Sequence, residues 1–386
     1  MPATPRSRDP RATAGWVVFG IFRTMSSSFA EPRVKGLSAA APEMVARVDS
    51  GTGYELVLGL RMFVDDEDPA SYAVGPEWFG RVHELAGREL LSAIDRYSGG
   101  HESTFGYLLA LVAAADAPRD VTAFLAALEE TPPLELRQLL LGSRLRTYRG
   151  GVSDEVIAAA AGGDAGAARD LLETCLDWQR KPYEHVLSVD ADTAKECLLA
   201  ACRGWYTAVL HTDERATARA LRRSARAARA LAERLALDQL VDSVTRGIRY
   251  SPEPGIGRVL LVPHVVSRPW SIFTEADDTK IVCYGVAESH VSRNAPPDPL
   301  VAAYKALGDE TRLRILRRLA EGPATLQELT DLTGLAKSTV HGHLLVLRTA
   351  GLAVTDISKK SGYALRREVL AESAALLETY LEGTEE

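Results

Sequence analysis

The sequence has few of the residues and motifs on which several large classes of proteins depend. Its 386 residues include only four cysteines, and these show no paired spacing: Cys175, Cys197, Cys202 and Cys283. Neither a disulfide framework nor a thiolate metal site is therefore indicated. Gly51-Thr52-Gly53 lacks the third glycine of a dinucleotide-binding loop, and no Gly-Lys-Ser/Thr phosphate loop or nucleophile elbow occurs. We expect no catalytic residues, no cofactor, no metal and no enzyme activity.

Long hydrophobic runs are absent as well. The apolar run Trp16–Phe22 is far shorter than the ~20 residues that span a bilayer, so we expect no membrane contact. Basic residues before it and Ser28–Ala30 after it only weakly resemble a secretory signal. We interpret residues 1–43 as a disordered leader, or as a mis-assigned start upstream of Met25 or Met44. Because cysteines without paired spacing are typical of a reducing compartment, we predict a cytoplasmic protein.

Excess positive charge is missing from the chain as a whole but present near its end. The formal net charge is −7. From Arg312 to Arg367, however, ten Lys or Arg residues stand against four Asp or Glu residues, a balance of +6. Glu368–Glu386 then adds six carboxylates. A local basic patch on an acidic chain is typical of a protein that contacts nucleic acid through one module.

The basic segment has the pattern of a winged helix-turn-helix within residues 300–386. Thr325 and Glu328 form a capping-box pair at the start of a short helix, and Gly334 supplies the tight turn between two helices. A second helix is predicted from about Lys337 to Ala350. On one side of it, apolar residues repeat at the three- and four-residue spacing of a buried face: Val340, Leu344 and Leu347.

The other side of the second helix and the ribbon that follows carry the candidate DNA contacts. Helix, turn, polar-faced helix and basic ribbon in this order are the layout of a DNA reader. We expect the second helix to enter the major groove and the Lys359–Lys360 tip to contact phosphates. His341 and His343 are two residues apart, so they point in different directions and form no shared metal site. We expect His341 to face outward and His343 to pack against the core and touch a phosphate. The predicted DNA-binding residues are Lys337, Ser338, Thr339, His341, His343, Lys359 and Lys360.

Three blocks of this segment occur together: Leu307–Leu316, Leu335–Leu344 and Ala350–Leu352. In sequence, order and spacing they resemble the ArsR-type winged-helix regulators of bacteria. The resemblance implies a homodimer that binds double-stranded operator DNA and is released by an effector. It covers about the last quarter of the chain.

The chain departs from this family at three places. Ala336 stands where the family has a Ser before the recognition helix, and its side chain has no oxygen with which to cap that helix. Gly342 occupies a position that often holds a long polar side chain. The cysteine-bearing metal box expected near residues 327–332 is missing. We therefore predict an effector that is not a metal ion.

Residues 44–250 are expected to form an all-α domain. Pro76 begins a helical pattern that ends at Gly99-Gly100, and a longer pattern over 193–248 is interrupted near 211–213. The pattern is that of several packed helices, without a motif that assigns this domain a function.

Two clusters in this domain have alternative interpretations. Asp177–His185 mixes polar and aromatic residues, and ordinary helix-surface residues explain it better than a ligand pocket does. A basic face is formed by Arg222, Arg223, Arg226 and Arg229. A solvated or helix-packing face is the favoured interpretation, and a second DNA contact is the alternative.

Composition changes after residue 250. Ser251–Gly255 is rich in turn residues, and three β-rich runs follow: Arg258–Val266, Pro269–Phe273 and Lys280–Val286. We predict a small antiparallel β segment over 251–292 and a linker over 293–299. The expected fold class is mainly α, with a multi-helix N-terminal domain, this β segment and a C-terminal winged helix-turn-helix.

Together these observations predict a cytoplasmic, dimeric transcriptional regulator, more specifically a repressor. A small-molecule effector or a partner would act through its N-terminal domain. The alternative is a helical ligand-binding or protein-interaction module whose winged helix serves mainly for dimerisation. Salt-dependent binding to operator DNA separates the two.

Overall fold

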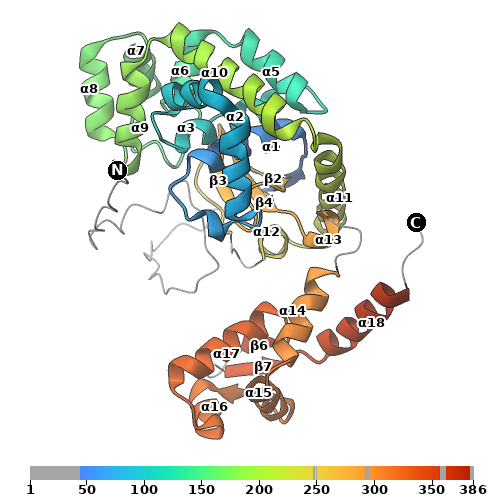
Figure 1. Ribbon diagram of the computed structural model, residues 1–386. Helices are drawn as coiled ribbons and strands as arrows, with labels where there is room; N and C mark the ends of the chain where they lie inside the picture. The colour runs from blue at the N-terminus through green and yellow to red at the C-terminus, as the bar shows by residue number, and fades with distance from the viewer. Residues whose placement is uncertain (1–43, 247, 249, 292–295, 357–361, 383–386) are drawn as a thin grey trace, which may run out of the picture. The chain divides into compact units, whose positions relative to one another are not determined.

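The polypeptide divides into two units, Met1–Val286 (unit 1) and Ala287–Glu386 (unit 2). The computed structural model describes residues 44–246, 248, 250–291, 296–356 and 362–382. Helices dominate both units, which confirms the mainly α class (Figure 1). Among the described residues, no helix combines the length and the apolar composition that crossing a membrane requires.

Unit 1 begins with a strand, continues through a long series of helices and ends with three further strands. The first strand is β1 (Val45–Val48). The helices are α1 (Thr52–Val64), η1 (Pro69–Ser71), α2 (Gly75–Ser98), α3 (Ser103–Gly106), α4 (Leu109–Ala114), α5 (Val121–Glu130), α6 (Pro133–Leu140), α7 (Asp154–Ala161), α8 (Ala165–Thr174), α9 (Asp177–Ser188), α10 (Ala191–Trp205), the π-helix η2 (Tyr206–Leu210), α11 (Glu214–Ala232) and α12 (Leu237–Thr245). The later strands are β2 (Arg258–His264), β3 (Ile272–Ala276) and β4 (Thr279–Gly285).

Several helix boundaries lie where the sequence places them. Helix α2 begins next to Pro76 and ends at Gly99, whose φ of 57° is left-handed and therefore suits glycine. The predicted break near 211–213 is real, because a π-helix and a turn separate α10 from α11.

The four strands form one sheet in the order β1-β2-β4-β3, and this corrects the predicted antiparallel segment. Only β3 and β4 are antiparallel, joined at the Asp277-Asp278 turn, while β2 pairs with β4 and β1 with β2 in parallel. The turn residues specify the β3–β4 hairpin locally. No short sequence pattern specifies which strand β2 pairs with. Strand β1 comes from a segment that the sequence predicts to be wholly helical. Long-range packing decides both pairings.

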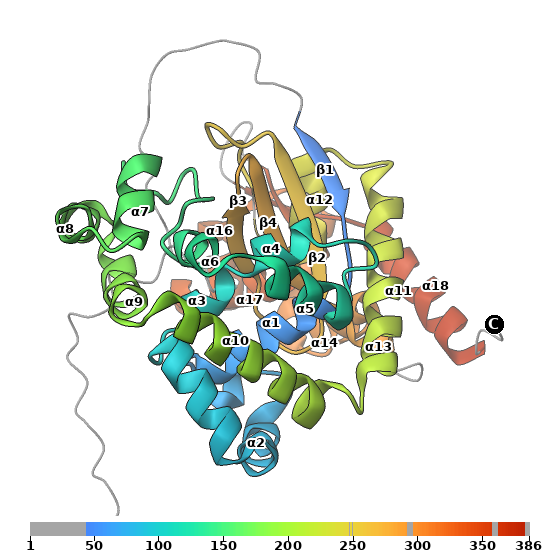
Figure 2. The same cartoon turned by 90° about the horizontal axis from the view of Figure 1, so that it is seen from above.

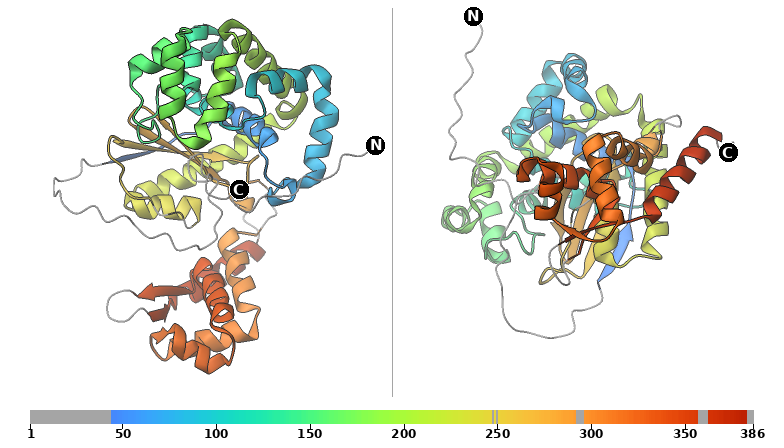
Figure 3. Two further views of the ribbon diagram at one scale, coloured as in Figure 1. Left: turned by 90° about the vertical axis from the view of Figure 1, so that its left-hand side faces the viewer. Right: turned by 90° about the horizontal axis from the view of Figure 1, so that it is seen from below.

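Helices cover both faces of the sheet. Along β4, Ile281 and Cys283 contribute to the core that α1 to α10 share. Val282 and Tyr284 point to the opposite face and pack with residues of α11 and α12. Figure 3 (left) shows the strands nearly edge-on with helices above and below, and Figure 2 shows α11 beside β1. The alternation of side chains along a strand therefore builds two cores from one sheet.

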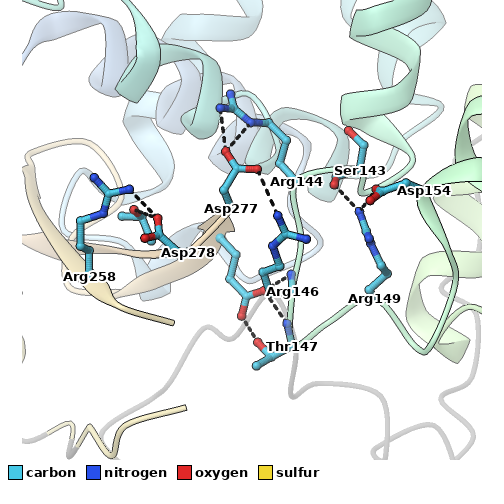
Figure 4. A network of polar contacts seen from close by, with 11 residues as sticks. Ser143, Arg144, Arg146, Thr147, Arg149, Asp154, Arg258, Asp277 and Asp278 are labelled. Carbon is cyan, nitrogen blue, oxygen red and sulfur yellow. Dashed lines mark hydrogen bonds and ion pairs between the residues drawn. The ribbon is translucent and has the colours of Figure 1, made fainter. Parts of the chain in front are cut away.

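Polar bonds connect the loop after α6 to the β3–β4 hairpin, some of them at the surface and some buried (Figure 4). The Arg144 guanidinium donates to Asp277 over 2.8 and 3.0 Å. Glu275 accepts from the backbone N–H groups of Arg146 (2.8 Å) and Thr147 (2.9 Å). The buried Lys280 ammonium lies 3.2 Å from the same carboxylate. Because each of these charges has a partner, the network stabilises the loop's position on the sheet.

Unit 2 contains six helices and a three-stranded sheet among its described residues. The helices are α13 (Glu288–Val291), α14 (Asp298–Leu307), α15 (Glu310–Ala320), α16 (Leu326–Thr333), α17 (Lys337–Thr349) and α18 (Glu368–Glu382). The strands are β5 (Ala324–Thr325), β6 (Ala353–Asp356) and β7 (Gly362–Leu365), in the order β5-β7-β6. Their apolar residues form a core of their own around Ile315, Leu329, Val340 and Leu347.

Candidate nucleic-acid interface

Helix α16 starts at the capping box that the sequence predicts. Glu328 N–H donates to Thr325 Oγ1 (3.3 Å), and Thr325 N–H donates to the Glu328 carboxylate (2.7 Å). Two backbone donors of the first turn are thereby satisfied, which is typically worth about 1 kcal/mol to helix stability. The helix ends at Gly334, whose φ of 69° is left-handed. A residue with a Cβ would be strained there, so the tight turn into α17 depends on glycine.

Helix α17 is anchored through one face. Val340, Leu344 and Leu347 are almost completely buried in the core of unit 2. Burying each of these side chains stabilises the unit by ~1.5–3 kcal/mol. At its end, Gly351 adopts φ 72°, Gly351 N–H donates to Arg348 O and Leu352 N–H to Leu347 O, both over 2.9 Å. This is the hydrogen-bond pattern of a Schellman motif, and it fixes where the helix stops.

The N-terminal end of α17 is exposed. Lys337, Ser338 and Thr339 all lie on the surface, and His341 is half-buried beside them. Ala336 is the N-cap residue and provides no side-chain cap, as its lack of an oxygen predicts. First-turn N–H groups of this 13-residue helix can therefore donate hydrogen bonds to a phosphate oxygen. A Cβ at Gly342 would meet no atom within 4 Å, so the surface is open there.

His343 lies apart from these residues. Its ring is mostly buried, and Nδ1 is 3.8 Å from Oδ1 of Asp309. Asp309 is the N-cap of α15 and accepts a hydrogen bond from Arg312 N–H (2.9 Å). This bond, the Arg312 charge and His343 together hold the pKa of Asp309 below its usual range. His343 thus points toward the start of α15, which agrees with packing against the core; its contact with a phosphate stays a prediction.

The ribbon after α17 has the predicted antiparallel pairing. Val354 of β6 pairs with Ala364 of β7, and β5 adds a short third strand. Lys359 and Lys360, the predicted tip of this wing, lie outside the described residues.

Arg348 is a further candidate contact that the sequence reasoning did not single out. It is exposed on the last turn of α17. With Lys337 and His341 it forms a series at i, i+4 and i+11, so the three residues lie along one side of the helix. The spacing of these three residues in the sequence is the signal that identifies Arg348.

The polar cluster of α9 is a packing feature of unit 1. Gln179 is fully buried and donates to Tyr183 Oη (2.9 Å) and to Tyr148 O (3.0 Å). His185 Nε2 lies 3.1 Å from the carbonyl oxygens of Arg96 and Tyr97. Interior hydrogen bonding therefore explains these residues, some of which are more buried than ordinary helix-surface residues. Among the described residues, no group of three or more His, Cys, Asp or Glu side chains is arranged to hold a metal ion.

One segment of unit 2 is similar to known proteins. Residues 309–355 match the sequence model of the ArsR family of bacterial regulatory proteins. The chain is also similar to a crystal structure of an ArsR family transcriptional regulator, with 29% identity over 22% of this chain and 94% of that chain and a TM-score of 0.20. No curated protein matches the chain. Unit 2 therefore carries an ArsR-type helix-turn-helix, a DNA-binding module of transcriptional regulators.

Proposed function

We propose that the chain is a homodimeric transcriptional repressor that reads operator DNA with α17 and contacts the phosphate backbone with its wing. The observation that carries this proposal is the exposed polar start of α17, where Lys337, Ser338 and Thr339 project from a helix anchored on its opposite face. The N-terminal residues of a recognition helix are those that meet base edges in this motif. Because Ser338 and Thr339 are short and Gly342 has no side chain, few base contacts are available, and recognition would depend partly on DNA shape.

The proposed dimer is supported by apolar side chains at the surface of unit 2. Helices α14 and α18 pack against each other. Tyr304 on α14 is 44% exposed, and Leu370 and Leu381 on α18 are 38% and 72% exposed. Large apolar side chains left in water on a pair of packed helices favour association with a second copy.

Unit 1 is the proposed site of control. Between α2 and α10 it has an open hollow of about 230 Å³ lined by Glu89, Ala93, Arg96, Glu196, Cys197 and Ala200. This volume is below the ~300–1,000 Å³ of most small-molecule sites. We therefore propose either a small effector or a macromolecular partner for unit 1. We expect that zinc, cadmium or arsenite leaves DNA binding unaltered, since the sequence offers no thiolate or histidine set at ligand spacing. Release from the operator at about micromolar metal would contradict this expectation.

Genome-wide mapping of bound DNA, followed by fluorescence anisotropy with the recovered site, tests the proposal. We expect an inverted repeat with half-sites about one helical turn apart and an affinity that falls steeply with salt. A dimer that shows no salt-dependent affinity for duplex DNA would instead support the interaction-module alternative.

A further inference from the structure

Helix α11 of unit 1 carries a row of arginines that neither the helix-turn-helix nor the core of unit 1 uses. The row, here called the arginine stripe, consists of Arg215, Arg219, Arg222, Arg226 and Arg229. All five residues are exposed. Their spacing of four, three, four and three residues places them within about 80° of arc on a helix with 100° per residue. The stripe extends over about 21 Å along the helix axis.

The stripe faces solvent. Ala220, Leu221, Ser224, Ala225 and Ala228 are the buried residues of α11. At 100° per residue their directions centre roughly opposite the arginines. This geometry argues against a helix-packing role for the arginines within unit 1. Helix packing is one of the two interpretations that the sequence favours for the basic face; a solvated face is the other.

Few carboxylates of unit 1 form ion pairs with the arginine stripe. The only carboxylate within α11, Glu214, accepts hydrogen bonds from Thr52 Oγ1 and Tyr206 Oη, both over 2.9 Å. Arg229 donates to the carbonyl oxygen of Val48 (3.0 Å). In the described part of the chain, the ion pairs include none of the other four stripe residues. Like charges at three- and four-residue spacing destabilise a helix. The stripe contains no glutamate that would pair with an arginine at this spacing and stabilise the helix.

We infer that the arginine stripe binds the phosphate backbone of duplex DNA as a second, sequence-independent contact. Duplex DNA presents one negative charge per ~1.7 Å of its axis, so a row of about 21 Å meets many phosphates. The guanidinium group is the side chain best suited to phosphate, because it donates two parallel hydrogen bonds to it. The inference rests on the proposed function, since the chain must be a DNA-binding protein for the contact to operate.

The experiment uses the full chain and a random-sequence duplex of about 40 bp, with anisotropy recorded over a series of salt concentrations. Replacing three stripe residues, Arg219→Gln, Arg222→Gln and Arg226→Gln, is expected to flatten the slope of log affinity against log salt by about 2.7. The corresponding triple Lys variant is expected to retain the wild-type slope, because counterion release follows charge. A matched control, Arg81→Gln, Arg88→Gln and Arg180→Gln, removes the same charge from exposed sites elsewhere in unit 1 and is expected to leave the slope unchanged.

Several outcomes would overturn the inference. An unchanged slope in the stripe variant, while the wild type binds DNA, refutes the stripe contact but leaves the proposed function standing. An equal loss in the matched control would show that net charge alone is responsible. Loss of binding to phosphatidylserine vesicles with an unchanged DNA slope would assign the stripe to a membrane surface. A wild-type chain without any DNA affinity would instead refute the proposed function and this inference with it.

Discussion

Two buried ionisable residues of unit 1, Glu55 on α1 and His264 at the end of β2, have pKa values shifted in opposite directions. Burial raises the pKa of Glu55 to about 7, although its carboxylate accepts N–H bonds from Val265 (2.9 Å) and Val266 (2.6 Å). Burial lowers the pKa of His264 to about 3, although Nε2 bonds to Trp270 O (3.0 Å). In both residues desolvation outweighs the hydrogen bonds, so the folded state favours the neutral form of each.

These shifts predict how unfolding depends on pH. Glu55 has a raised folded pKa, so its stabilising contribution is present below its ordinary value of 4.5 and is lost as the pH rises toward 7. His264 has a depressed folded pKa, so its contribution is present above 6.5 and is lost as the pH falls. Between these ordinary values the two contributions oppose each other, each with a slope of ~1.4 kcal/mol per pH unit. Glu55→Gln removes the contribution of Glu55, so only that of His264 remains. The free energy of unfolding of this variant should therefore rise by up to ~2.7 kcal/mol between pH 4.5 and pH 6.5.

Urea unfolding at a series of pH values, followed by tryptophan fluorescence, measures this effect. All five tryptophans of the chain precede residue 287, so the signal reports on unit 1 alone. Glu84→Gln, at an exposed site on α2, is the control and should not change the pH dependence. Identical pH profiles for Glu55→Gln and wild type would show that Glu55 is already ionised in the folded protein.

The proposed preference for one DNA sequence belongs to the same scale, because it would depend on individual side chains of α17. Thr339→Ala combined with His341→Ala should relax the preference for the operator more than it lowers non-specific affinity, since a base contact is worth ~1–3 kcal/mol. Competition binding between the operator and scrambled duplexes measures the ratio. His211→Ala with Thr212→Ala removes the same side-chain types from exposed positions in unit 1 and serves as the control. Retention of the wild-type ratio would place base recognition on another segment.

At the scale of elements, the sequence was sufficient wherever the determinants are local. The capping box at Thr325, the left-handed turn at Gly334 and the buried stripe of α17 depend on neighbours a few residues away, and all three are confirmed. The sheet of unit 1 could not be derived in this way. Strand β1 has only four residues and pairs with β2 more than 200 residues later, so no local pattern reveals it. The orientation of His343 toward Asp309 likewise depends on the packing of α17 against α15.

The wing is the element whose proposed DNA contact is most directly testable. Replacing Lys359 and Lys360 with Ala should weaken binding to every duplex alike, because phosphate contacts carry no sequence information. The salt slope should become less steep by about two units. Operator and scrambled duplexes measured in parallel supply the comparison. A slope equal to that of the wild type would remove the wing tip from the interface.

At the scale of the whole molecule, the chain combines two units with separate hydrophobic cores. The core of unit 2 is formed by residues between Ala306 and Ala353, while unit 1 has its own cores on the two faces of its sheet. The helix-turn-helix lies within unit 2, so it assigns no function to the larger unit 1. The proposed control by an effector or partner and the inferred backbone contact of α11 both assign it one.

The proposed dimerisation is the property of the whole molecule on which recognition of an inverted repeat would depend. Tyr304→Glu with Leu381→Glu places charges on the exposed apolar surface of α14 and α18 and should yield a monomer in sedimentation velocity. A monomer engages one half-site at a time, so affinity for an inverted repeat should fall by roughly 10²-fold or more while affinity for a single half-site is retained. Leu85→Glu with Leu134→Glu alters two exposed leucines of unit 1, which are 62% and 51% exposed, and should leave both the mass and the affinity unchanged. If the α14 and α18 variant stays dimeric and keeps its affinity, another surface of the chain forms the dimer.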